Sequence, residues 1–231
     1  MSNKDTDAGL EFLESPEGLA GELNKFEKKI EKNRKLLLIV GGVLVVGLLG
    51  WFGYNWYIKS QDEEAQVLLF SPFFAFEADS LNKTLNGSAG SPGVLAISEE
   101  YDNTPAGNLA ALIAGTSLLK QGKFDQAIEK LKSFSSSDLV IQGKAYALIG
   151  DAYMEKNQPE EAISYYQKAV DYKPSAYFTP GYMIKLGVAY EKAKKNQEAI
   201  KVYTNLIEKY PQAAEVLTAK KNRAFLEAAA E

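Results

Sequence analysis

The longest apolar segment of the chain is a run of 23 residues, 36–58, that contains no charged side chain. As a helix rising about 1.5 Å per residue, this run would be about 34 Å long, enough to cross a hydrocarbon core of about 30 Å. We predict an uncleaved transmembrane helix; the alternatives are a buried core helix and a signal peptide, whose apolar region is shorter and precedes a small-residue cleavage site. The end of the run instead holds an aromatic cluster typical of the membrane interface, made of Trp51, Phe52, Tyr54, Trp56 and Tyr57.

The charges that flank this run predict its orientation. Lys and Arg accumulate on the cytoplasmic side of a spanning helix. Downstream, over a similar length, only Lys59 is basic. We therefore expect a cytoplasmic tail (1–35), a transmembrane helix (36–58) and an exported domain (59–231), which in a bacterium means a single-pass inner-membrane protein with a periplasmic domain. The six upstream cations are Lys25, Lys28, Lys29, Lys32, Arg34 and Lys35.

Two further patterns belong to this N-terminal part. Within the span, Gly47, Gly50 and Gly53 recur every three residues, which would let another transmembrane helix approach closely, although glycine is also simply common in spanning helices. Before it, apolar residues at helical spacing predict an amphipathic juxtamembrane helix that either lies on the anionic inner leaflet or extends the span. Residues 1–15 are expected to be disordered. The apolar residues of the amphipathic helix are Leu19, Leu23, Phe26 and Ile30.

The region after residue 100 contains an internal repeat. Two segments share identical internal spacings, and Gly150 and Gly187, which correspond, are 37 residues apart. The first segment has Tyr146, Ile149, Gly150, Tyr153, Ala162, Tyr166, Ala169 and Pro174. The second has Met183, Leu186, Gly187, Tyr190, Ala199, Tyr203, Leu206 and Pro211.

These positions resemble the tetratricopeptide repeat, a helical hairpin of 34 residues. The glycine and the alanine allow the two helices of a hairpin to press together, and the closing proline ends the second helix. Leu206 stands where the pattern expects a small residue, which predicts looser packing there. A weaker third copy precedes these two, with Thr104 and Pro105 as N-cap and first helical residue and Gly122 in its inter-helix turn.

The resulting prediction is an all-α chain: one N-terminal transmembrane helix followed by a tetratricopeptide α-solenoid. We place the repeats at about 108–141, 143–176 and 180–213, and a capping helix at 212–229. Residues 60–102 are less regular and predict a degenerate first hairpin: a helix over 65–85 broken near Ser71 and Pro72, a flexible loop over 86–93 and a short helix over 94–101. No strand or Gly-Lys-Ser/Thr accompanies the loop glycines, which disfavours a phosphate site.

Composition narrows the chemistry that this fold can host. The chain has no Cys and no His, which excludes thiol nucleophiles, Ser-His-Asp triads and the usual zinc and iron–sulfur sites. Its net charge of −4 argues against nucleic acid as a partner. We expect no cofactor, no metal and no enzyme; a Lys/Glu-based hydrolase is disfavoured because the acidic residues of the repeats have the spacing of solvated helix faces.

Tetratricopeptide solenoids bind proteins or peptides on a concave side lined by the first helix of each hairpin. The side chains expected to face this groove are mostly apolar, which favours an apolar helix or extended segment as the ligand; alternatively, the first hairpin of the chain covers them. The candidate residues are Leu112, Thr116, Leu119, Lys144, Asp151, Met154, Ile184, Val188 and Glu191, together with Leu109, Ala147 and Gly181 at equivalent positions.

The complete layout, a short basic tail, one span and an exported domain of about three repeats, resembles the YfgM-type ancillary subunits of the bacterial SecYEG translocon. The segment Glu99–Leu109 is similar to the one that precedes the first full repeat in that family. The resemblance implies a non-enzymatic co-chaperone or scaffold that lies beside the SecYEG channel, pairs with a PpiD-like periplasmic chaperone and contacts exported client polypeptides. A scaffold for envelope assembly or division is the alternative, since repeats define a fold and not a partner.

Overall fold

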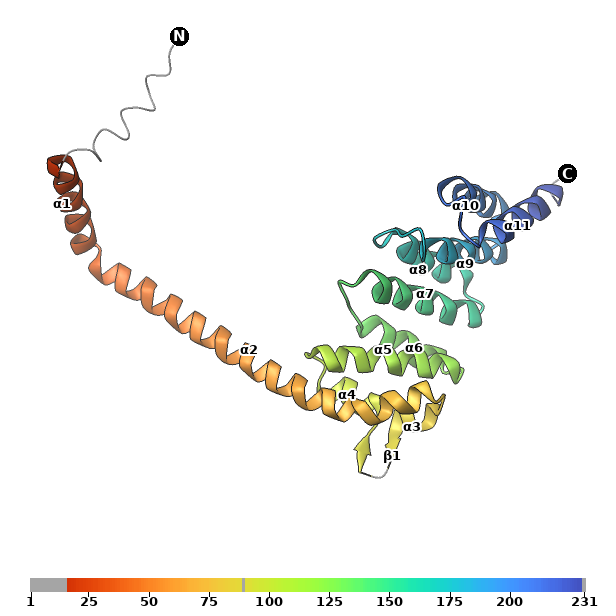
Figure 1. Ribbon diagram of the computed structural model, residues 1–231, viewed down its shortest axis with the longest axis horizontal. Helices are drawn as coiled ribbons and strands as arrows, with labels where there is room; N and C mark the ends of the chain where they lie inside the picture. The colour runs from red at the N-terminus through yellow and green to blue at the C-terminus, as the bar shows by residue number, and fades with distance from the viewer. Residues whose placement is uncertain (1–15, 89, 230–231) are drawn as a thin grey trace, which may run out of the picture. The chain divides into compact units, whose positions relative to one another are not determined.

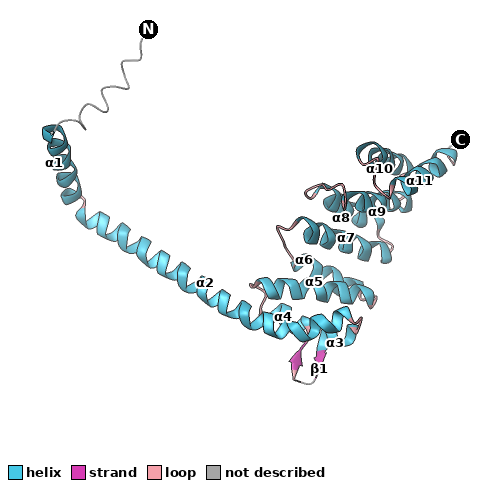
Figure 2. Cartoon of the chain, in the orientation of Figure 1, coloured by secondary structure: helices cyan, strands magenta, loops and turns pink. Residues whose placement is uncertain are grey.

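A computed structural model describes residues 16–88 and 90–229 (Figure 1). These residues divide into two compact units, with the boundary between Tyr57 and Ile58. The predicted disorder of residues 1–15 lies outside the described residues. The regular secondary structure of the described residues is helical except for one pair of two-residue strands (Figure 2). This confirms the predicted all-α fold.

The first unit consists of α1 (Pro16–Lys32) and most of the apolar half of α2 (Arg34–Glu77). α2 is the one helix of the described residues that is long and apolar enough to cross a membrane, and none of its most apolar 18-residue window is buried. Leu44, Trp51 and Trp56 are all more than half exposed. Such a fully apolar, uncovered surface is what a lipid-facing helix presents.

The predicted break at Ser71–Pro72 is wrong, because α2 continues through Pro72 to Glu77. A proline inside a helix lacks one backbone donor, and its ring also crowds the carbonyl four residues earlier. Here Pro72 is buried on the same face as Ala65 and Leu69, so packing offsets that cost. The chain turns later, where Asp79 has a φ of 54° and the backbone N–H of Ser80 donates to the carbonyl of Ala75 at 2.8 Å.

The predicted loop over 86–93 is a short antiparallel hairpin instead. It follows α3 (Leu81–Asn86) and pairs β1 (Gly87–Ser88) with β2 (Ser91–Pro92). Gly87 has a φ of 81°, and a Cβ added at Gly93 would collide with the carbonyl of Leu85. The glycines that suggested an irregular loop therefore allow two backbones to approach each other.

The rest of the second unit is a series of helices packed chiefly against their sequence neighbours (Figure 1). The short helix α4 (Val94–Glu100) is as predicted. Thr104 caps the next helix as expected: its hydroxyl oxygen accepts a hydrogen bond from the Gly107 N–H at 3.0 Å. The helices that follow are α5 (Pro105–Lys120), α6 (Phe124–Ser133), α7 (Leu139–Glu155), α8 (Pro159–Asp171), α9 (Thr179–Lys192), α10 (Asn196–Lys209) and α11 (Val216–Ala228).

Close contact between paired helices explains the repeated glycines. A Cβ added at Gly150 would lie 2.5 Å from the ring of Tyr166, and one added at Gly187 would meet the Tyr203 ring more closely still. At the equivalent place in the first hairpin, a Cβ on Gly115 would lie 2.5 Å from Leu131. Because real Cβ contacts are essentially never that short, only glycine fits without moving the facing side chain or its helix.

Looser packing around Leu206 was the wrong expectation. Its side chain is fully buried in a cluster with Met183 and Ala199. Ala219 of α11, also fully buried, belongs to the same cluster. The small residue at this contact is thus Ala219 of the following helix, and the larger Leu206 fills the space between α10 and α11.

Candidate functional site

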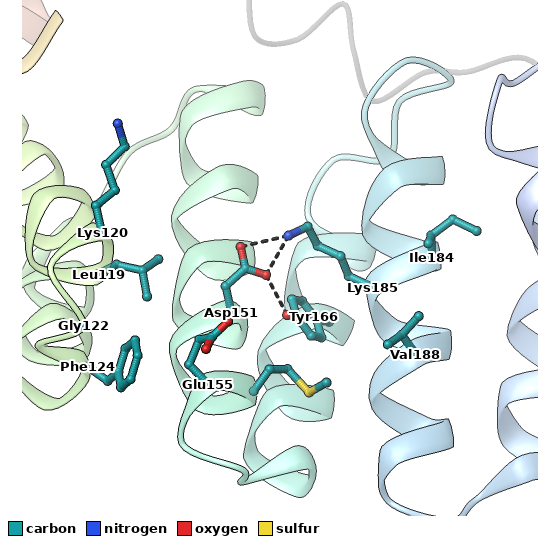
Figure 3. A pocket seen from close by; sticks show the side chains of 11 residues that line it. Leu119, Lys120, Gly122, Phe124, Asp151, Glu155, Tyr166, Ile184, Lys185 and Val188 are labelled. Atoms are coloured by element: carbon teal, nitrogen blue, oxygen red, sulfur yellow. Dashed lines mark hydrogen bonds and ion pairs between the residues drawn. The ribbon is translucent and has the colours of Figure 1, made fainter. Parts of the chain in front are cut away.

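The second unit contains an open groove of about 660 Å³ between successive hairpins (Figure 3). The end of α5, the start of α6 and faces of α7, α8 and α9 form its walls. None of the residues that line this cavity comes from the degenerate first hairpin predicted over 60–102. Its lining residues are Leu119, Lys120, Gly122, Phe124, Asp151, Met154, Glu155, Tyr166, Ile184, Lys185 and Val188.

Apolar side chains stand on the opposing walls of the groove. Leu119 and Phe124 come from one side, and Ile184 and Val188 from the other (Figure 3). Ile184 and Val188 are one turn apart on α9, so both project from the same helix face. Met154 of α7, half-buried, contributes an adaptable thioether side chain. Such walls suit the apolar side chains of a bound polypeptide.

A polar cluster lies between these walls, centred on Asp151 (Figure 3). The Tyr166 hydroxyl donates to Asp151 Oδ1 at 2.6 Å, and Lys185 Nζ lies 2.6 Å from the same oxygen and 2.8 Å from Oδ2. Burial, followed by the charge of Asp151, raises the pKa of Tyr166 above its ordinary value. The phenol therefore stays protonated, and the cluster ties α7, α8 and α9 together.

Charged side chains also occupy the edge of the groove. Lys120 Nζ pairs with Asp79 Oδ1 at 2.7 Å, although both side chains are largely exposed. Glu155, which lines the cavity, is exposed as well. The groove thus has apolar walls with charges of both signs between and beside them.

The next repeat builds a related cluster away from the groove. The Tyr203 hydroxyl donates to Glu191 Oε1 and accepts from Asn222 Nδ2 at 3.2 Å. Burial is the main reason that the pKa of Tyr203 is raised, with the hydrogen bond to Glu191 next. Asn222 belongs to α11, so this cluster ties the terminal helix to the last hairpin.

The structure brings together five of the nine nominated groove residues and leaves four outside. Glu191 is engaged with Tyr203, Thr116 donates to the Leu112 carbonyl at 2.8 Å, and Lys144 is exposed elsewhere on α7. Leu112 packs against a core cluster instead. The five that line the cavity are Leu119, Asp151, Met154, Ile184 and Val188.

The sequence did not predict the groove residues that come from the second helix of a hairpin or from first-helix positions outside the expected inward register. Tyr166 was identified only as a position of the repeat pattern, and Phe124 was not identified as a candidate. Lys185, 34 residues after Asp151, carried a usable signal: one repeat length brings side chains of neighbouring hairpins side by side. The other missed lining residues are Lys120, Gly122 and Glu155.

The remaining candidate residues, the three glycines of the span, are not packed against another part of the described chain. A Cβ added at Gly47, Gly50 or Gly53 would meet nothing within 4 Å. Across residues 16–88 and 90–229, no three acidic side chains gather in a way that would hold a metal ion.

Comparison with known proteins decides the family. The model of the tetratricopeptide repeat-like domain family matches residues 30–223. The chain belongs to this family. The glycines, alanines and tyrosines described above are thus the packing positions of a tetratricopeptide repeat-like domain.

Individual proteins also resemble this tetratricopeptide repeat-like chain. A curated relative from Neisseria gonorrhoeae, an ancillary SecYEG translocon subunit, is 26% identical over 175 residues, covering 74% of this chain and 79% of its own. This similarity agrees with the resemblance found in the sequence. The crystal structure of MamA protein matches with a TM-score of 0.51 at 19% identity, over 73% of this chain and 87% of that one. At that identity, the match to MamA concerns the fold alone.

Proposed function

We propose that this protein is a non-enzymatic, membrane-anchored tetratricopeptide repeat protein that binds polypeptide segments in its groove beside the SecYEG translocon. The observation that carries the proposal is the groove of about 660 Å³, with apolar walls around the Asp151 cluster. Similarity to an ancillary SecYEG translocon subunit supports the location of this binding. The ligand we expect is an apolar helix or extended segment whose side chains enter between Phe124 and Val188.

The proposed anchor is the apolar part of α2, residues 36–58, with residues 1–35 in the cytoplasm and 59–231 in the periplasm of a bacterial cell. The excess of cations before the span supports this orientation. Protease added to spheroplasts should then digest the C-terminal domain. Complete protection of that domain in intact spheroplasts, with digestion only after lysis, would reverse the proposed topology.

The proposed role is that of an ancillary subunit and co-chaperone scaffold for exported proteins. Its partners would be the SecYEG channel, a PpiD-like periplasmic chaperone, exported polypeptides and the surrounding lipid. Catalysis has no support in the groove, because Asp151 and Lys185 neutralise each other and Tyr166 keeps its proton. The lining of the groove is therefore suited to binding other proteins.

Gentle solubilisation and affinity isolation of the full-length tagged protein test the proposed partnership. We expect channel subunits to be recovered, and Val188→Glu, which places a charge in the apolar wall, to reduce recovery about fivefold or more. Lys201→Glu on α10, outside the cavity, is the matched control and should bind normally. Thermal unfolding of both variants checks that they remain folded.

Two results would contradict the proposal. Recovery of no translocon subunit, under conditions that keep the channel intact, removes the translocon role. Recovery of envelope-assembly or division proteins instead would favour the second function, a scaffold for those complexes.

A further inference from the structure

The part of α2 that follows the apolar run presents a second apolar surface, which we call the α2 stripe: Val67, Phe70 and Phe74. These side chains are 75%, 68% and 52% exposed. The rings of Phe70 and Phe74 meet edge to face, with centroids 4.7 Å apart. Because Ala65 and Leu69 on the other face are buried in the core, the helix is apolar on two sides and covered on only one.

The surface beside the stripe is hollowed. A cavity of about 420 Å³ is lined by Glu63, Gln66, Val67 and Phe70, and a neighbouring one of about 270 Å³ shares Gln66 and Phe70. Exposed aromatic side chains with adjoining hollows are characteristic of interaction sites. The stripe therefore suits a helix or ridge from another molecule.

Acidic side chains border the stripe at both ends. Glu63 precedes Val67 by four residues and Glu77 follows Phe74 by three, so all lie on one face of the helix. Both carboxylates are exposed. Two copies tethered in one membrane and paired stripe to stripe would place Glu63 opposite Glu63 and Glu77 opposite Glu77. That repulsion disfavours symmetric pairing and favours a partner with an apolar, basic face.

The terminal helix α11 carries such a face. Leu217 and Phe225 are 78% and 72% exposed, and exposed Lys221 lies between them at four-residue steps. Lys220 borders the same face, whereas Ala219 and Leu226 on the other side are buried. The end of a solenoid is normally closed by a polar outer face. Exposed leucine and phenylalanine there need a different explanation.

We propose that α11 of one copy docks on the α2 stripe of a second copy. The apolar lengths match: Val67 to Phe74 and Leu217 to Phe225 are both about 10–12 Å along a helix. Only this mixed pairing sets Lys220 and Lys221 beside Glu63 or Glu77, since α11 paired with itself would oppose lysine to lysine.

The contact is heterologous, because it joins two different surfaces. Each pairing leaves one α2 stripe and one α11 face free, so further copies can add in the same way. None of the residues lining the groove belongs to either surface. Assembly of this kind would array several open grooves beside one another.

Cysteine cross-linking of the full-length protein in membranes tests the contact, because the natural chain has no cysteine. One tagged copy carries Gln66→Cys beside the stripe and a differently tagged copy carries Ala224→Cys on the α11 face. Both positions are exposed, and both substitutions keep the apolar side chains in place. We expect oxidation to give the mixed disulfide dimer at least about fivefold above a Gln197→Cys control on α10.

Charge reversal supplies the independent test. Glu63→Lys should lower the mixed cross-link about two- to fivefold, and Lys221→Glu in the partner copy should restore it. Cross-linking confined to Gln66→Cys with itself would overturn the proposal in favour of a symmetric dimer. Yields no higher than the Gln197→Cys control would also overturn it and would leave the stripe to another protein.

Discussion

The side chain of Tyr166 serves both packing and the groove. Its ring fills the space that Gly150 leaves between α7 and α8, while its hydroxyl holds Asp151 in the groove. Tyr203 repeats the arrangement with Gly187 and Glu191. A tyrosine that packs against the glycine thus also holds a carboxylate, which lines the groove at Asp151 and lies outside it at Glu191.

Gly150→Ala should destabilise the protein by about 1–3 kcal/mol, since the new methyl group would force the Tyr166 ring or its helix to move. The comparison variant is Gly181→Ala in α9, where the nearest atom to the added Cβ is Glu215 Oε1 at 3.7 Å. That change should be neutral or stabilising by at most about 1 kcal/mol. Denaturant unfolding measures both, and equal losses of stability would contradict the packing role assigned to Gly150.

Asp138 at the start of α7 predicts a pH dependence. Its carboxylate accepts hydrogen bonds from the N–H groups of Ile141 and Val140, which lower its pKa below the ordinary 3.8. The resulting stabilisation of the folded state is complete above the ordinary pKa of 3.8, which applies to the unfolded chain. It is lost as the pH falls through the lower pKa of the folded state.

Asp138→Asn keeps an acceptor oxygen but cannot titrate. Wild type should therefore have the higher melting temperature at pH 7, and this difference should shrink below about pH 4. Melting curves from pH 7 to pH 2 measure it. A difference that stays constant across this range would show that the charge of Asp138 contributes nothing to the cap.

At the scale of elements, the sequence pattern predicted a helix correctly where the local sequence signals and the packing of the folded chain favour the same structure. The repeated glycine and alanine spacings predicted the helical hairpins, and Thr104 with Pro105 predicted the start of α5. Pro72 was misread because the burial that offsets its missing donor depends on α2 packing into the core, which no local pattern reveals. The hairpin at Gly87–Pro92 was missed because glycine permits both an irregular loop and a close backbone approach.

The terminal helix α11 should contribute to stability as well as to assembly. Its Ala219 and Leu226 cover Tyr203 and Leu206, both fully buried. Ending the chain after residue 212 would expose these side chains, at a cost on the order of 2–4 kcal/mol. Thermal unfolding of the shortened protein should show a lower melting temperature, and an unchanged one would contradict this role.

At the scale of the whole molecule, the mean hydropathy of −0.22 averages two parts of very different polarity. An apolar span and a polar repeat domain average to the value of an ordinary soluble protein. The sequence predicted the apolar span and the repeat domain. It also predicted the groove residues that lie at the inward positions of the first helix of each hairpin, because the spacing of the repeat shows which side chains of those helices face inward. The second-helix members, such as Tyr166 and Phe124, depended on how neighbouring hairpins stack.

Site-specific photo-cross-linking in intact cells tests the central claim, polypeptide binding in the groove, most directly. A photoreactive phenylalanine analogue replaces Glu155, which is exposed and lines the cavity, or, as the control, Glu161, which is exposed on α8 outside it. We predict that position 155 gives adducts with translocon subunits or exported polypeptides several-fold above position 161. Equal adducts at both positions, or none at position 155, would contradict the account.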